Sequence, residues 1–177
     1  MHSDADFTSP PPLRGTVLAL ILRPGQEDPD EPEVLMVGPC CAGDEPGRNF
    51  RLPGGPMREG EAPSHALVRT VREETCLDVE PARLLVHDWV PATGTASAGI
   101  DLVYATVPLT GTVEVKLPRP AGGRAPDLLS YKWIQAGELG EHCMPRQAKR
   151  VRAALVALTD GGVAELHDGE SAHPAAA

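Results

Sequence analysis

The chain has 177 residues and a formal net charge of −9 at pH 7. That length suits one domain with a core of its own, and the acidic balance argues against a general binder of nucleic acid or of anionic membranes. No apolar run approaches the length of a membrane span, and the polar first residues lack the apolar core of a signal peptide. We therefore expect a cytoplasmic protein whose four cysteines stay reduced.

The first part of the chain predicts strands separated by loops. Residues 1–13 are polar and contain three consecutive prolines, which predicts a disordered arm. The apolar run Gly15–Leu22 predicts a buried strand, and Glu33–Val37 predicts a second strand that forms a hairpin with it. A loop rich in glycine, proline and cysteine then leads to a short strand, Phe50–Leu52.

The segment Gly54–Leu77 carries the candidate site. It begins with a Gly-Gly turn and continues as a helix that starts at Ser64 or at the pair Ala62-Pro63, because proline is tolerated in a first helical turn. Near the helix end lie two adjacent carboxylates, Glu73 and Glu74. Neighbouring carboxylates beside a backbone carbonyl suit a hard cation such as Mg²⁺. The alternative is a solvated acidic helix face that pairs with nearby arginines.

Three more strands and a second helix are expected after this segment. The strands are Ala82–Val90, Ile100–Val107 and Ser130–Ile134. Pro145–Leu158 predicts a helix whose core face holds Val151, Leu155 and Leu158, at positions i, i+4 and i+7. From Thr159 to residue 177 we expect a disordered tail.

The spacing within Gly54–Leu77 resembles the signature of the Nudix hydrolases, Gly-x5-Glu-x7-Arg-Glu-U-x-Glu-Glu-x-Gly-U, in which U is a bulky aliphatic residue. Matching positions are Gly55, Glu61, Arg69, Val71, Glu73, Glu74 and Leu77. The strand with Trp133 and the following Glu138-Leu139 are also similar to the family's late segment. The resemblance covers about residues 14–158 and implies an α/β protein with the Nudix fold, an α/β/α sandwich with a mixed central sheet.

The resemblance implies metal-dependent hydrolysis of a diphosphate linkage, in a nucleoside diphosphate joined to another group or in another organic diphosphate. Mg²⁺ or Mn²⁺ would neutralise the phosphate oxygens and orient the attacking water. By motif position, the metal ligands would be the Gly55 carbonyl, Glu73 and Glu74. Glu61 would pair with Arg69 and hold the loop against the helix.

Further site residues are expected outside the signature. The family often places an acidic ligand or base before its Trp strand, and Asp127 is the only carboxylate within Gly122–Ile134. Arg48, Arg51 and Arg58 bracket the Gly-Gly turn and are candidates for binding substrate phosphates, since a guanidinium matches phosphate oxygens. The alternative for each arginine is a solvated pair with a neighbouring carboxylate.

Two loops are expected to border the substrate pocket, because loops at the sheet ends close over the substrate in the resembling fold. These are Pro91–Gly99 and Thr110–Pro126, both rich in small residues and turn formers. The expected partner is a small-molecule diphosphate, with no nucleic acid and no membrane. The oligomeric state stays open, with a homodimer as one option.

Two positions depart from the signature. Thr70 stands where the family has a glutamate that binds metal or positions water, and a threonine hydroxyl cannot serve as a base near pH 7. Cys76 stands where the family has a glycine, which either costs about 1 kcal/mol of local strain or moves the helix end by a residue. Two hypotheses follow: a hydrolase slowed at Thr70, or a Nudix-fold module that binds a nucleotide-like metabolite with little or no turnover.

Overall fold

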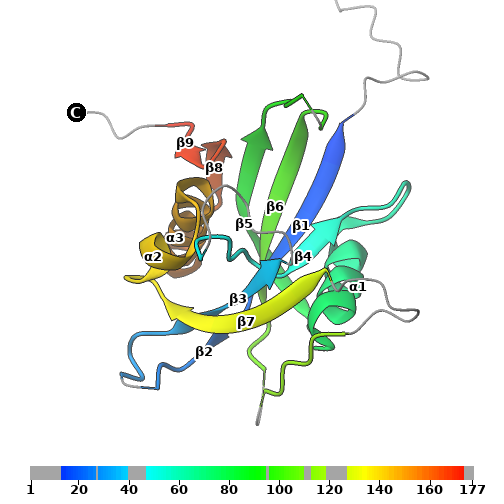
Figure 1. The fold of residues 1–177 in the computed structure, drawn as a ribbon. Coiled ribbons are helices and arrows are strands. Elements are labelled where there is room, and N and C mark those ends of the chain that lie inside the picture. The colour runs from blue at the N-terminus through cyan, green and yellow to red at the C-terminus, as the bar shows by residue number, and fades with distance from the viewer. Residues whose placement is uncertain are drawn as a thin grey trace, which may run out of the picture.

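Two β-sheets and the helices that cover them make up the fold (Figure 1). The computed structural model describes residues 13–26, 28–39, 47–94, 96–109, 113–118 and 127–173. The larger sheet has the order β4-β1-β6-β5-β8-β9. Its strands are β1 (Arg14–Leu20), β4 (Gly54–Pro56), β5 (Pro81–Val90), β6 (Gly99–Thr106), β8 (Ala164–His167) and β9 (Glu170–Ser171). Because β1 and β6 pair in parallel while β4 and β1 pair antiparallel, this sheet is mixed.

The smaller sheet is antiparallel and runs in the order β2-β3-β7. Its strands are β2 (Leu22–Arg23), β3 (Glu33–Pro39) and β7 (Leu128–Gln135). The predicted hairpin is therefore reduced to the short pairing of β2 with β3, because the longer β1 joins the other sheet.

Helices cover both faces of the sheet layer (Figure 1). Helix α1 (Pro63–Thr75) packs its Leu67 and Val71 with Val17 of β1. Helices α2 (Leu139–His142) and α3 (Pro145–Asp160) lie on the other face, where Val151 packs in one cluster with Leu18. Alternate residues of β1 thus face opposite helices, which explains its continuous apolar sequence. The predicted α/β/α sandwich with a mixed central sheet is confirmed.

The Gly-Gly pair belongs to a strand, not to the turn that the sequence predicts. Gly54 has a φ of 139°, and a Cβ there would lie 2.1 Å from the Val17 carbonyl oxygen. Only glycine allows β4 to approach β1 this closely. The predicted strand Phe50–Leu52 is also wrong, since its regular pairing is limited to one bridge between Arg51 and Val37.

Helix α1 ends where the signature glycine would stand. Cys76 adopts the left-handed conformation with a φ of 55°, and its N–H donates to the Arg72 carbonyl at 3.0 Å. The helix end has therefore not moved, and the cysteine accepts the strain that glycine would avoid.

The chain beyond Thr159 differs from the expectation of a disordered tail. Helix α3 continues to Asp160 and is capped by Gly161, which has a φ of 78°. Strand β8 then pairs in parallel with β5, and Leu166 is buried in the core. Residues 174–177, and all of the predicted arm except Leu13, lie outside the described residues.

Helix α3 is joined to the sheet by a buried ion-pair network. Arg150 is 0% exposed and donates from Nε and Nη2 to Asp88 Oδ2 on β5, at 2.9 and 2.5 Å. The same guanidinium lies 3.0 Å from Asp101 on β6, and the Gly169 N–H donates to Asp88 Oδ1 at 3.1 Å. Of the predicted core face, Val151 is fully buried, whereas Leu155 and Leu158 lie at its margin. None of the helices in these described ranges is long and apolar enough to cross a membrane.

Candidate active site

A cavity of about 540 Å³ lies between the last turns of α1 and strand β4. Its lining combines carboxylates, arginines and small residues: Gly54, Gly55, Pro56, Met57, Arg58, Arg69, Thr70, Glu73, Glu74, Pro118, Asp127 and Leu128. The helix brings its acidic residues to this place because Leu67 and Val71 bury the neighbouring face of α1. Acidic groups from α1 and from the start of β7 therefore share one cavity.

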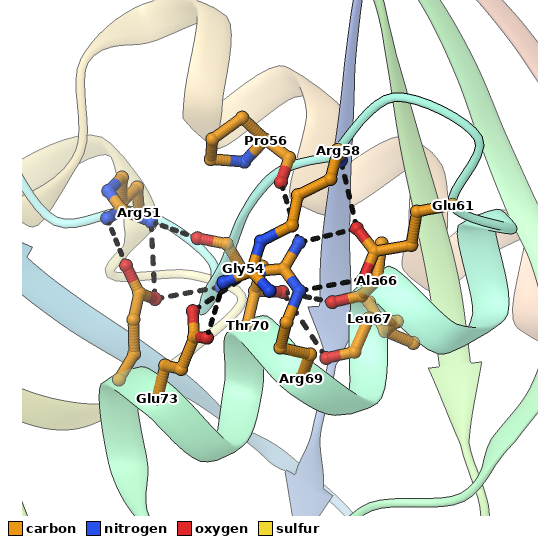
Figure 2. Close-up of polar contacts among 11 residues, drawn as sticks. Arg51, Gly54, Pro56, Arg58, Glu61, Ala66, Leu67, Arg69, Thr70 and Glu73 are labelled. Carbon is orange, nitrogen blue, oxygen red and sulfur yellow. Dashed lines mark hydrogen bonds and ion pairs between the residues drawn. The ribbon is translucent and has the colours of Figure 1, made fainter.

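Glu61 and Arg69 form a bidentate ion pair (Figure 2). Arg69 donates from Nε and Nη2 to the two carboxylate oxygens of Glu61, at 2.7 and 2.6 Å, and Nη2 also donates to the Pro56 carbonyl at 3.0 Å. The Arg58 backbone N–H donates to Glu61 Oε2 at 2.9 Å. The bonds from Arg69, followed by the one from the Arg58 N–H, lower the pKa of Glu61 to about 2. The pair fixes the loop after β4 against α1, as expected from the sequence.

Glu74 is held by Arg51 and by the backbone of β4. Arg51 Nη2 lies 2.5 Å from Glu74 Oε1, and the Gly54 N–H donates to Glu74 Oε2 at 2.8 Å. Arg51 Nη1 also donates to the carbonyls of Leu52 and Gly54, at 3.2 and 3.1 Å. This arginine thus takes a place between a carboxylate and a backbone carbonyl, the kind of donor set that also suits a cation.

Glu73 points into the open part of the site. Its side chain is 53% exposed and accepts from Arg58 Nη2 at 3.2 Å and from Arg69 Nη1 at 3.0 Å. Figure 2 shows the Arg58 and Arg69 side chains approaching this carboxylate from the β4 side and from the helix. Of the two adjacent glutamates, Glu73 is the more accessible to a ligand.

Thr70 is 3% exposed and directs its hydroxyl into its own helix. Thr70 Oγ1 donates to the Ala66 carbonyl at 2.8 Å, and a Cβ on Gly55 would lie 3.3 Å from Thr70 Cγ2. The hydroxyl proton is therefore used inside α1, and the methyl group faces β4. Thr70 fills the place of the family's carboxylate without offering a charged group.

Of the remaining predicted site residues, some line the cavity and others do not. Asp127 lines it directly, and Arg58 is the only one of the three candidate arginines that does so. Arg51 acts on the site through Glu74. Arg48 is not among the lining residues, and its charge lies near Cys143, where burial raises the thiol pKa to about 11.

One of the two predicted pocket loops reaches the cavity. Pro118, within Thr110–Pro126, forms part of its wall, whereas none of the described residues of Pro91–Gly99 lines it. That segment joins β5 to β6 at the end of the sheet away from α1 (Figure 1). The sequence gives no signal for Met57 and Leu128 as lining residues, because their position depends on the pairing of distant strands.

The chemistry of the carboxylates around the cavity suits a hard divalent cation. Glu73, Glu74 and Asp127 offer oxygen ligands, as does the backbone of β4. Within the part of the chain that the structure describes, however, no three His, Cys, Asp or Glu side chains converge as a formed metal cluster. Arginines hold Glu73 and Glu74 on different sides. A cation would fit this donor set after those arginines rearrange.

The profile of the NUDIX domain family matches residues 12–158. No curated protein sequence gives a significant match.

Three solved structures that are similar to this chain are distant from it in sequence. A MutT protein from Methanosarcina mazei Go1 is 19% identical, with a TM-score of 0.59, and the match covers 85% of this chain and 96% of that one. The NUDIX domain of Shewanella oneidensis NrtR complexed with ADP ribose is 16% identical, with a TM-score of 0.60 and coverage of 88% and 94%. A C. elegans Ap4A hydrolase is 15% identical, with a TM-score of 0.60 and coverage of 84% and 99%.

These likenesses show a shared fold, and the family match spans nearly all of the described residues except the end of α3 and strands β8 and β9. The site adds the paired Glu61 and Arg69 and the adjacent Glu73 and Glu74 at the positions that the family signature requires. The chain belongs to the NUDIX family, whose members generally hydrolyse nucleoside diphosphate derivatives.

Proposed function

We propose that this protein hydrolyses a diphosphate linkage in a nucleoside diphosphate derivative, with Mg²⁺ or Mn²⁺ as cofactor. The observation that carries the proposal is a single cavity that is lined by Glu73, Glu74 and Asp127 together with Arg58. Oxygen ligands for a cation and a donor for phosphate lie side by side there, as hydrolysis of a diphosphate requires.

Glu73, Glu74 and the Gly55 carbonyl would hold the cation, which family members typically use. The bound cation would neutralise phosphate oxygens and polarise the attacking water. Glu61 and Arg69 have a positioning role: their ion pair holds the loop after β4 against α1 and so sets the distance between Gly55 and the two glutamates.

Asp127 is the proposed base, because Thr70 cannot fill that role. A carboxylate oxygen of Asp127 would accept a proton from water as the water oxygen forms a bond to phosphorus. The bond from that phosphorus to the bridging oxygen breaks, and the second phosphate leaves with the electron pair. Asp127 lines the same cavity as Glu73 and Glu74 and lies directly before β7, which supports this assignment.

Arg58 is the proposed ligand of the substrate phosphates, and Arg51 contributes positive charge behind Glu74. The proposal of a nucleotide-linked substrate is supported by two structural relatives. One is a NUDIX domain complexed with ADP ribose, and the other is an Ap4A hydrolase. Both ligand names denote nucleotides with linked phosphates.

A binding module with little turnover is the second candidate, and the buried hydroxyl of Thr70 favours it. Release of phosphate and nucleotide from a panel of organic diphosphates, with Mg²⁺ and with Mn²⁺, separates the two functions. Turnover that is lost in Glu73→Gln supports the hydrolase. Binding of a diphosphate by calorimetry, without release of product, would support the module.

A further inference from the structure

Arg58 is held less firmly than the other two arginines of the site, Arg51 and Arg69. Its side chain is 67% exposed, and its one carboxylate partner among the described residues is Glu73, at 3.2 Å. An ion pair this exposed contributes little to stability and is easily exchanged for another partner.

The other arginines of the site cannot move so freely. Arg69 makes two hydrogen bonds to Glu61 and one to the Pro56 carbonyl, and its side chain is 20% exposed. Arg51 is bound to Glu74 and to backbone carbonyls, and its side chain is 29% exposed. If Glu73 were taken by a cation, Arg58 alone could leave without breaking further contacts.

The backbone of Arg58 nevertheless stays at the wall of the cavity. Its N–H donates to Glu61 Oε2 at 2.9 Å, and Glu61 is itself held by Arg69 (Figure 2). A fixed backbone with a long, loosely held side chain allows the guanidinium to turn within the cavity instead of moving away from it.

We propose, on the basis of the proposed function, that Arg58 couples metal binding to substrate binding. In the metal-free protein its guanidinium neutralises Glu73. When a divalent cation takes Glu73, the released guanidinium binds the diphosphate, whose oxygens match its planar fork. Because coupling free energies are reciprocal, metal and diphosphate then strengthen each other's binding beyond their direct attraction.

The first test measures Mn²⁺ binding to the free protein by calorimetry. Arg58→Ala leaves Glu73 with one arginine fewer, so Mn²⁺ should bind about two- to fivefold more tightly than to wild type. Arg58→Lys keeps the charge and should stay near the wild-type affinity. Arg72→Ala is the matched control: Arg72 precedes Glu73 in α1 but pairs with Asp78 outside the cavity, and its loss should leave the affinity unchanged.

The second test uses methylenediphosphonate, a diphosphate analogue whose carbon bridge cannot be hydrolysed, with and without Mn²⁺. Mn²⁺ should raise its affinity for wild type by at least about fivefold more than for Arg58→Ala. Equal enhancement in both proteins, or unchanged Mn²⁺ affinity in Arg58→Ala, would overturn the coupling. Neither test measures hydrolysis, so a protein with the expected coupling and no turnover would contradict the proposed function while the role of Arg58 held.

Discussion

At the scale of single residues, the site is a balance between carboxylates and arginines. Glu61, Glu73 and Glu74 each accept hydrogen bonds from at least one guanidinium. The glutamate missing at Thr70 is therefore the one acidic position of the signature that no arginine needs to neutralise. Restoring it changes the charge of the cavity directly.

Thr70→Glu should raise turnover by about tenfold or more if the site is only impaired. Thr70 lines the cavity beside Gly55, so a glutamate at this position would bring a carboxylate to the same cavity. Steady-state kinetics on an accepted diphosphate measure the change. Thr70→Gln controls for side-chain size. No gain in turnover, with unchanged Mn²⁺ affinity, would mean that Asp127 already serves as base or that catalysis has been lost.

Glu61→Gln should lower the Tm at pH 7, and this difference from wild type should disappear in acid. The pKa of Glu61 falls from the ordinary 4.5 to about 2 in the folded protein, so its ionised form stabilises the fold above about pH 4.5. That stabilisation is lost as pH falls toward 2. The difference in Tm between variant and wild type, followed from pH 7 to pH 2.5, should shrink below pH 4.5. A constant difference would show that the charge is not its cause.

At the scale of elements, helix α1 was the most predictable part and β4 the least. The spacing of Glu61, Arg69, Glu73 and Glu74 is local information, and a helix converts it directly into a shared face. A Gly-Gly pair, by contrast, is typical both of a turn and of a strand that passes close to its neighbour. Only the approach to Val17 decides between them.

Pairing between residues far apart in the sequence explains the other features that the sequence did not predict, the contact of Arg51 with Glu74 and strand β8. Arg51 and Glu74 are 23 positions apart, and their contact exists because β4 brings the preceding chain beside the end of α1. Strand β8 was missed because Ala164–His167 has only four residues, too few for its alternation of apolar and polar residues to reveal a strand. Its stability comes from the partner strand β5.

Residues 113–118 pack against α1 through Val115, and Pro118 at their end lines the cavity. Val115 is buried in the α1 core cluster, and the Lys116 N–H donates to the Thr75 carbonyl at 3.0 Å. Removing residues 119–124 leaves these packing contacts in place, so Tm should stay within a few degrees of wild type. The deletion begins directly after Pro118 of the cavity wall, so KM for the diphosphate should change. Val115→Ala should instead lower stability by about 1–2 kcal/mol without a matching change in KM. Identical kinetics in the shortened protein would assign those residues to a plain linker.

At the scale of the whole molecule, buried ion pairs join α3 to the sheet, and the sequence pattern does not predict them. Arginine is rarely fully buried, so a helix pattern assigns Arg150 to solvent. The structure instead surrounds it with Asp88, Asp101 and Gln147. Its planar guanidinium joins two strands, β5 through Asp88 and β6 through Asp101.

Arg150→Met should destabilise the fold by about 3–5 kcal/mol, because it leaves the fully buried Asp88 without its cation. Lys149→Met is the matched control on the same helix, since Lys149 pairs with Glu170 at the surface and should cost less than about 1 kcal/mol. Urea unfolding at pH 7 measures both. Similar losses in the two variants would show that the buried network contributes no more than a surface pair.

Because β8 pairs with β5, a shortened protein that ends at the family boundary would lack part of the sheet. The family profile ends at residue 158, before the two strands that complete the sheet. A protein cut there would leave the backbone N–H and carbonyl groups of β5 open along Val86–Trp89, and it would lose the Gly169 N–H that Asp88 accepts. An uncovered strand edge is a template for pairing with another molecule. We therefore expect a protein that ends at residue 158 to self-associate more readily than the full chain, because β8 no longer covers the edge of β5.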